Sequence, residues 1–143
     1  MENITEFAVG KVSSSQCWEA LQQKPNSYLI DVRAPEEWEE TGMADLSSIK
    51  KNANLLTWIF FTPNIHPNKK FIAELEQVFP NKDVELFFIC KSGGRSMQAA
   101  NAALSDGYKN SYSVDDGFVG SMFDNNFIPL NGWIKNNLPR RKA

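Results

Sequence analysis

Apolar residues along this chain fall into short continuous runs, separated by stretches in which apolar positions recur with helical spacing. The continuous runs predict strands over 28–32, 53–56, 84–89 and 111–114. The helical spacing predicts helices over 14–23, 35–40, 69–79, 96–105 and 132–135. Strands that alternate with helices in this way indicate an α/β domain with a mainly parallel sheet.

Several residues mark where the predicted elements begin and end. Ser13 and Gln16 have the spacing of a capping box, which predicts a helix beginning just after Ser13. Cys17 falls on the inner face of that helix, and we interpret it as a small core residue. Phe7 and Val9 are the apolar anchors of a lead-in arm or strand that precedes the helix.

The composition predicts a single globular domain over residues 1–143. The chain is 42% hydrophobic and 22% charged, which is typical of a domain with a substantial core. Residues 139–143 are predicted to form a flexible basic tail. A formal net charge of -2 argues against nucleic acid as a partner, because nucleic-acid binding needs a broad basic surface.

The sequence also predicts a cytoplasmic protein without a metal or cofactor. Its first residues are acidic and lack the apolar segment of a signal peptide, and no apolar run is long enough to cross a membrane. We expect Cys17 and Cys90 to stay as thiols in a reducing compartment. One histidine, His66, and two distant cysteines do not make an ordinary zinc site.

The candidate chemistry is concentrated in one loop, between the strand at 84–89 and the helix at 96–105. A helix N-terminus there would offer free N–H groups and a partial positive charge, both of which favour a thiolate. Glycines in the loop allow successive N–H groups to face one centre. The alternative is a buried structural cysteine beside a tight turn. The candidate residues are Cys90 as the nucleophile and Lys91, Ser92, Gly93, Gly94, Arg95 and Ser96 as the substrate-binding loop.

Over nearly its whole length the chain resembles a single-domain rhodanese, a sulfurtransferase with a three-layer α/β fold. The segment Leu29-Ile30-Asp31-Val32-Arg33 followed by Pro35-Glu36-Glu37-Trp38 is similar to the strand and acidic helix of that family. The segment Cys90-Lys91-Ser92-Gly93-Gly94-Arg95-Ser96 is similar to its active-site loop, and Asp116-Gly117-Phe118 and Gly132-Trp133 are similar to its closing elements.

The resemblance implies a reaction and roles for individual residues. The Cys90 thiolate would take a sulfur from a small anionic donor such as thiosulfate, become a persulfide, and pass the sulfur to a thiol or a protein cysteine. Lys91 and Arg95 would bind the anionic end of the donor. Asp31 and Arg33 would support the loop rather than react.

Loop length distinguishes the sulfurtransferases from their relatives. Here four residues separate Cys90 from Arg95, whereas cysteine phosphatases have five and would need an arginine where this chain has Ser96. Lys91 departs from the Cys-Gly-Ser-Gly pattern of mercaptopyruvate-type enzymes, which favours thiosulfate as donor. Two alternatives stay open. One is a sulfur carrier or regulatory module without turnover, and the other is a phosphatase or arsenate reductase.

The sequence departs from the family pattern around the loop. The segment 42–46 keeps the glycine but lacks the histidine and proline of Gly-His-Ile-Pro-Gly-Ala, and Asp115-Asp116-Gly117 replaces a more usual Gly-Gly. The cluster at 58–61 and the segment at 123–131 resemble insertions that shape access for the acceptor. We interpret the cluster as core rather than pocket wall. Glu36 and Glu37 are interpreted as a solvated helix face.

Overall fold

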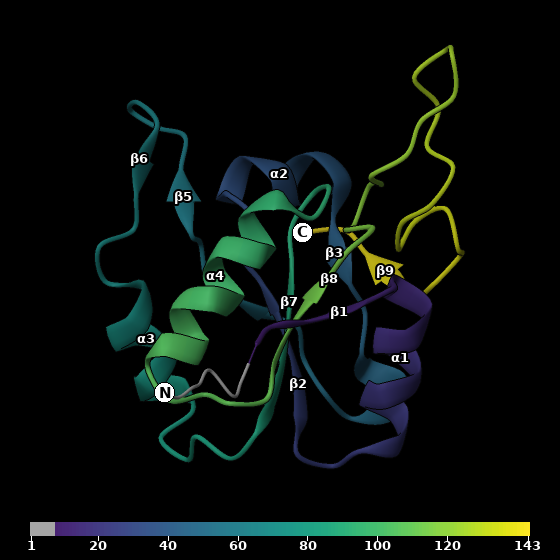
Figure 1. Cartoon of the computed structure of the whole chain (residues 1–143). Helices are drawn as coiled ribbons and strands as arrows, with labels where there is room; N and C mark the ends of the chain where they lie inside the picture. Colours follow the sequence, from purple (N-terminus) through teal and green to yellow (C-terminus); the bar gives the residue numbers. More distant parts are fainter. Residues whose placement is uncertain (1–7) are drawn as a thin grey trace, which may run out of the picture.

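A five-stranded parallel sheet forms the centre of the structure, a computed structural model that describes residues 8–143. The strands are β1 (Gly10–Val12), β2 (Ser27–Asp31), β4 (Asn54–Leu55), β7 (Glu85–Ile89) and β8 (Ser111–Val114). Their order is β1-β8-β7-β2-β4, and every neighbouring pair runs parallel (Figure 1). The predicted parallel α/β sheet is therefore confirmed, whereas the proposed anchor Phe7 lies outside the described residues.

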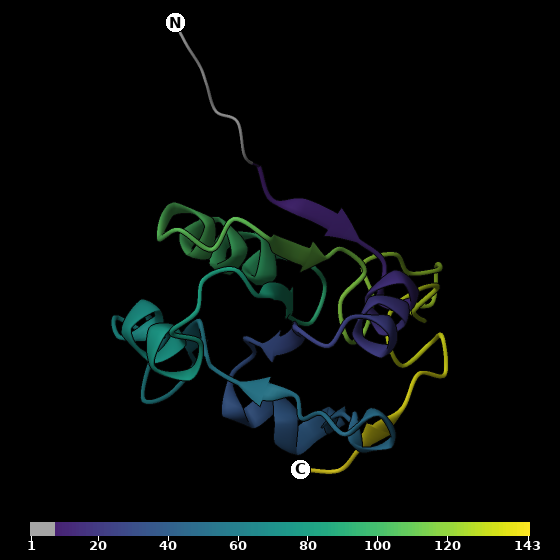
Figure 2. The ribbon, with the colours of Figure 1, turned by 90° about the horizontal axis from the view of Figure 1, so that it is seen from below.

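Helices cover both faces of this sheet (Figure 2). They are α1 (Ser14–Gln23), α2 (Pro35–Thr41), α3 (Phe71–Val78) and α4 (Gly94–Ser105), with a short 3-10 helix at Ser47–Ile49. Successive strand residues point to opposite faces. Ile30 and Phe88 therefore join the core beneath α3 and α4, while Leu29 and Phe87 join the core beneath α1. Cys17 is fully buried in this second core, as predicted.

Two small antiparallel pairs lie outside the central sheet. β5 (Ile59–Phe60) pairs with β6 (His66–Pro67), so residues 59–61 belong to a hairpin of intermediate burial rather than to the core. Trp58, at the start of the same cluster, packs against the core at Phe71, as predicted. β3 (Met43–Ala44) pairs with β9 (Arg140–Arg141). The structure thus differs from the expected flexible tail, because Arg140 and Arg141 are held by backbone pairing although their side chains are exposed.

The helix boundaries follow local hydrogen bonding. The capping box of α1 is present, with Ser13 accepting from the Gln16 N–H at 3.1 Å and Gln16 accepting from the Ser13 N–H at 2.8 Å.

The prediction of a helix over 132–135 is wrong. The Trp133 and Ile134 N–H groups donate instead to the carbonyls of Gly117 and Phe118, which ties this segment to the loop after β8.

The carboxyl ends of the central strands meet at one edge of the sheet, at the top of Figure 1. Val32 and Arg33 follow β2 there, Cys90 follows β7 and Asp115 follows β8. Ligands of open parallel sheets bind beyond this edge, so the fold brings the predicted loop to the position where a site is expected. Within residues 8–143, no helix has the length and apolar character needed to cross a membrane.

Candidate active site

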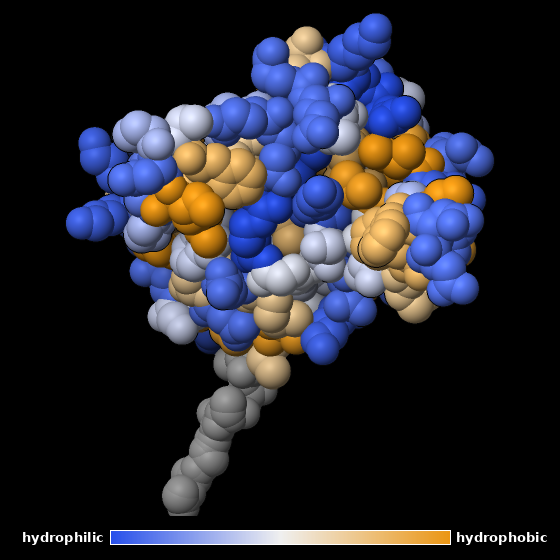
Figure 3. All heavy atoms as spheres, turned by 90° about the horizontal axis from the view of Figure 1, so that it is seen from above, coloured by the Kyte–Doolittle hydropathy of each residue, from blue (hydrophilic) through white to orange (hydrophobic). Residues whose placement is uncertain are grey.

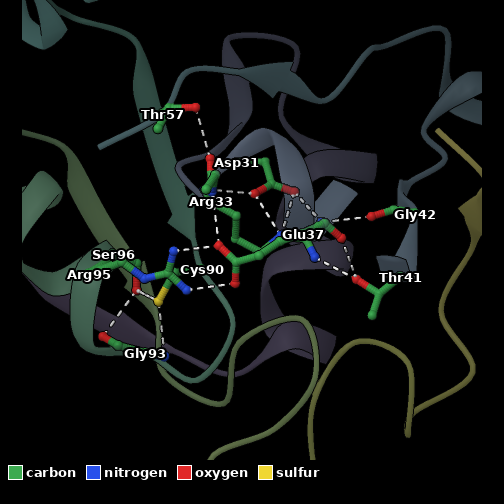
Figure 4. Close-up of polar contacts among 11 residues, drawn as sticks. Asp31, Arg33, Glu37, Thr41, Gly42, Thr57, Cys90, Gly93, Arg95 and Ser96 are labelled. Carbon is green, nitrogen blue, oxygen red and sulfur yellow. Dashed lines mark hydrogen bonds and ion pairs between the residues drawn. The ribbon is translucent and has the colours of Figure 1, made fainter. Parts of the chain in front are cut away.

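Cys90 lies at the base of the loop that connects β7 to α4, and only 1% of its surface is exposed. The backbone N–H of Gly93 donates to its Sγ at 3.1 Å, and the thiol faces Ser96 Oγ at 3.4 Å (Figure 4). Ser96 Oγ in turn donates to the Gly93 carbonyl at 3.1 Å and lies 2.8 Å from Ser113 Oγ. Because a hydroxyl can rotate to donate or accept, this network can solvate the sulfur as a thiol or as a thiolate.

The beginning of α4 supplies the electrostatic part of the site. Gly93 caps the helix with φ at 104°, a left-handed conformation that glycine adopts without strain. A Cβ atom at this position would come within 2.5 Å of the Asp115 carbonyl oxygen, so only glycine fits. The free N–H groups and the dipole of the first helical turn make this end of α4 a favourable place for a negative charge.

The loop rests on the segment that follows β8. The Phe118 N–H donates to the Cys90 carbonyl at 2.8 Å, and the Val119 N–H donates to the Lys91 carbonyl at 3.0 Å. Gly117 has φ at 69°, and any side chain there would collide with the Lys91 carbonyl. The loops after β7 and β8 therefore form one unit, which holds Cys90 in place through its backbone.

Arg95 does not point freely into the site, because it forms a two-pronged ion pair with Glu37 of α2 (Figure 4). The distances are 2.6 Å from Nη1 to Oε1 and 2.8 Å from Nη2 to Oε2. Burial by itself raises the pKa of Glu37, but hydrogen bonds from Arg95 and from the Ala34 N–H outweigh it and hold the pKa below its usual value. The interpretation of Glu37 as part of a solvated face was therefore wrong, although Glu36 is exposed.

The environment of Arg95 also includes an aromatic ring. Its guanidinium lies 5.5 Å from the centre of the Phe61 ring, a cation–π geometry. The hydrogen bonds to Glu37 raise the pKa of Arg95, so this residue stays charged. Glu37 balances most of the charge of Arg95. Lys91 and Ser92, in contrast, are exposed to solvent at the mouth of the loop.

Asp31 and Arg33 form a buried ion pair next to this site, with both side chains 1% exposed. Arg33 Nη2 and Nε donate to the Asp31 carboxylate at 2.8 and 2.9 Å. The remaining Arg33 donors reach Thr41 Oγ1 and the Gly42 carbonyl, both at 2.7 Å, and the guanidinium lies over the Phe118 ring at 4.2 Å. This network ties α2 to β2 and to the loop after β8.

Comparisons with known proteins show which family and which structures this chain resembles. Residues 9–142 match the family model of the STR4 middle domain. A protein of Rickettsia conorii, the uncharacterized RC0915, is 35% identical over 134 residues, which are 93% of this chain and 98% of that protein. The crystal structure of Rv0390 from M. tuberculosis superimposes with a TM-score of 0.84 at 34% identity, covering 96% of this chain and all of the other.

Further relatives, from rice and Drosophila, carry rhodanese-like names. The chain belongs to the rhodanese-like family. The polysulfide-sulfur transferase homodimer of Wolinella succinogenes shares the fold, with a TM-score of 0.64 at 20% identity, over 94% of this chain and 80% of that one. The rhodanese-like family is a sulfurtransferase-type family, and the fold predicted from the resemblance is the observed one.

The rhodanese-like loop brings most of the predicted residues together. Cys90, Gly93 and Ser96 are in direct contact, and Gly94 begins α4 two residues before the predicted helix start. Arg95 is near them but is bound to Glu37. Sequence reasoning missed the contributions of Glu37, Ser113 and Phe61. Of these, only Glu37 carried a signal, because it stands at the third position of a helix that begins with proline, where a carboxylate can bind a free N–H.

Replacing Glu37 by alanine is expected to lower the free energy of unfolding by about 1–3 kcal/mol, because the partly buried Arg95 and the Ala34 N–H lose their acceptor. Arg95 would also become mobile, which should lower roughly tenfold any sulfur transfer that depends on its position. Urea unfolding and steady-state kinetics measure the two effects. Glu36→Ala, which removes an exposed carboxylate from the same turn, is the matched control and should change neither.

The effect of Glu37→Ala on stability should depend on pH. A carboxyl whose pKa is lower in the folded state stabilises the fold above its unfolded pKa, and this contribution disappears as the pH falls through the folded value. The stability difference between Glu37→Ala and the unmodified protein should therefore be full at pH 7 and shrink in acid. A difference that stays constant between pH 7 and pH 3 would contradict this account of the ion pair.

Proposed function

We propose that this rhodanese-like domain is a sulfurtransferase that carries a sulfane sulfur on Cys90. The observation that carries the proposal is the position of Cys90 Sγ, 3.1 Å from the Gly93 N–H and in front of the first turn of α4. This arrangement stabilises an anionic sulfur, both as the attacking thiolate and as the persulfide that follows. The N–H groups of the loop are equally suited to hold the outer sulfur of that persulfide.

The proposed reaction has two steps. The Cys90 thiolate attacks the outer sulfur of thiosulfate, the bond between the two donor sulfurs breaks, and sulfite leaves with the bonding electron pair. A nucleophilic acceptor, cyanide in an assay or a thiolate in the cell, then attacks the outer sulfur of the persulfide. That sulfur moves to the acceptor, and Cys90 is released as a thiolate.

The proposed location is a reducing compartment such as the cytoplasm, because the two cysteines, Cys17 and Cys90, are both free and buried.

The residues around Cys90 have distinct parts in this scheme. Lys91, exposed at the mouth, would attract the anionic donor and the leaving sulfite. Arg95 contributes less free charge than its sequence position suggests, because Glu37 binds both of its terminal nitrogens. We therefore assign Arg95 mainly to holding the loop against α2, and Lys91 to donor binding.

Phosphatase or arsenate reductase chemistry is less well supported. A phosphate dianion needs an arginine that is free to bind two of its oxygens, whereas the Glu37 carboxylate already occupies Arg95 in that way. A sulfur carrier without turnover is the stronger alternative. The pairing of Arg95 with Glu37 favours it, since less free positive charge is left to bind a small anionic donor.

The test is to treat the purified protein with thiosulfate and measure two products. Thiocyanate formation in the presence of cyanide reports turnover, and intact mass reports the gain of one sulfur atom by the protein. Turnover together with that mass supports the enzyme, whereas the mass gain without turnover from thiosulfate supports the carrier. If neither appears with thiosulfate, polysulfide or a low-molecular-weight persulfide as donor, the proposed function is wrong.

A further inference from the structure

Two apolar projections border the mouth of the Cys90 loop. The hairpin arm comprises residues 59–67 and the loop arm comprises residues 119–131. They rise on opposite sides of the site in Figure 1, and Figure 3 shows apolar surface on either side of a hydrophilic hollow. Each arm is joined to the site, since Phe61 contacts Arg95 and the Val119 N–H binds the Lys91 carbonyl.

The loop arm is rigidly built although its apolar side chains face solvent. Asp124 organises its tip, with Oδ1 accepting from the Asn126 and Ile128 N–H groups at 2.8 and 2.9 Å. At its base, Asn131 Oδ1 accepts from the Ser121 N–H at 2.8 Å. The apolar residues that this framework exposes are Met122, Phe123, Phe127, Ile128 and Leu130, from 42% to 85% of their surface. An ordered frame around exposed apolar groups indicates an interaction surface.

Phe127 is the most exposed of these residues and also has an unusual backbone. Its side chain is 85% exposed, and its φ is 62°, in the left-handed region that phenylalanine rarely adopts. Residues 8–143 leave this ring largely uncovered. Strained backbone that is kept at an exposed position is typical of functional sites. The hairpin arm presents a comparable group, Ile65, which is 77% exposed at its turn.

We propose that the two arms dock a protein that receives the sulfur from Cys90, through a cysteine on a protruding segment bordered by apolar side chains. This inference rests on the proposed function and specifies its acceptor. The acceptor thiolate attacks the outer sulfur of the Cys90 persulfide, the bond between the persulfide sulfurs breaks, and Cys90 leaves as a thiolate. The acceptor protein then carries the persulfide.

The exposed apolar groups favour a protein over a small thiol, and the burial and charge of the site determine how its cysteine must be presented. A small acceptor would touch only the hollow, whereas the apolar groups of both arms gain free energy only when another apolar surface covers them. Because Cys90 is 1% exposed, a protein acceptor must present its cysteine on a narrow, protruding element. The charges are also complementary, because an anionic thiolate entering between the arms meets exposed Lys91 and the positive end of α4.

The experiment uses two cyclic peptides, each presenting a single cysteine at its turn. In one peptide, leucine and phenylalanine flank the cysteine, and in the other serines do. Transfer from preformed Cys90 persulfide is followed by the mass of the peptide in a single turnover. We expect the apolar peptide to accept sulfur roughly tenfold faster than the polar one, as burial of one large apolar side chain would give.

The variants Phe127→Asn and Ile65→Ser should reduce this preference several-fold and leave the rate with cyanide unchanged. Asparagine tolerates the left-handed conformation at 127, so the loop arm keeps its shape. Val78→Ser is the matched control, because Val78 is 48% exposed at the end of α3 and belongs to neither arm. It should retain the full preference for the apolar peptide.

Equal rates with both peptides, or a preference that survives in both arm variants, would overturn the docking proposal while leaving the proposed function intact. Equal peptide rates combined with Phe127-dependent sedimentation on phosphatidylglycerol vesicles would assign the arms to a membrane surface instead. Equal rates combined with a dimer that Phe127→Asn dissociates would assign them to a second copy of this chain. If no Cys90 persulfide forms with any donor, the proposed function and this inference both fail.

Discussion

Sulfur transfer is expected to fall by at least roughly 10³-fold in Cys90→Ser, because a serine oxygen cannot take sulfur from thiosulfate and pass it on. Serine can keep the hydrogen bonds to the Gly93 N–H and to Ser96 Oγ, so the loop should stay folded. Thiocyanate formation measures the loss, and intact mass should show no added sulfur. Thermal unfolding should be nearly unchanged, which separates the loss of the nucleophile from a loss of structure.

The second cysteine provides the control for this result. Cys17 is fully buried in the core beneath α1, and burial and the nearby Asp116 carboxylate raise the pKa of its thiol. A buried, protonated thiol is a poor nucleophile, so Cys17→Ala should keep turnover close to that of the unmodified protein. Sulfur transfer that persists in Cys90→Ser and disappears in Cys17→Ala would refute the assignment of Cys90.

Asp31→Ala is expected to destabilise the protein by about 3–5 kcal/mol, because it leaves the Arg33 guanidinium buried without its carboxylate. Arg33 cannot turn toward solvent easily, since it also donates to Thr41 and Gly42 and lies over Phe118. A loss of this size is a large part of the 5–15 kcal/mol that stabilises an ordinary domain. Urea unfolding followed by tryptophan fluorescence measures it.

A double variant separates the effect of an unpaired buried charge from the other effects of Asp31→Ala. Asp31→Ala combined with Arg33→Met removes both charges and should be more stable than Asp31→Ala alone, since no unpaired charge stays buried. If the double variant is the less stable of the two, Arg33 stabilises the fold mainly through its other contacts. A loss below about 1 kcal/mol in Asp31→Ala would contradict a structural role for this pair.

Much of the fold could be read from local patterns. The strands at β2, β7 and β8 and the helices α1 and α4 were predicted within a few residues, because their apolar spacing and capping signals lie within each segment. The segment at 132–135 was predicted as a helix and is not one. Its N–H groups bind carbonyls of the loop after β8, which are distant in sequence and leave no local signal.

The candidate site likewise combines features that the local sequence encodes with features that depend on packing. Cys90, its glycines and the following helix are contiguous, so the sequence by itself indicated a thiol in front of a helix N-terminus. The partner of Arg95 comes from α2, 58 positions earlier in the chain, and its identity depends on how the elements pack. The position of Glu37 in the first turn of α2 indicated a contact with a free N–H, but only packing decided that it also binds Arg95.

The sequence by itself thus determined the parallel α/β fold and the family resemblance, because strand and helix periodicity and contiguous motifs are local properties of the chain. Only the tertiary structure decided how the charges near Cys90 are distributed, since Glu37 neutralises Arg95 while Lys91 faces solvent. It also decided that residues 59–67 and 119–131 stand on either side of the loop. Such features depend on contacts between segments far apart in sequence, which no local pattern encodes.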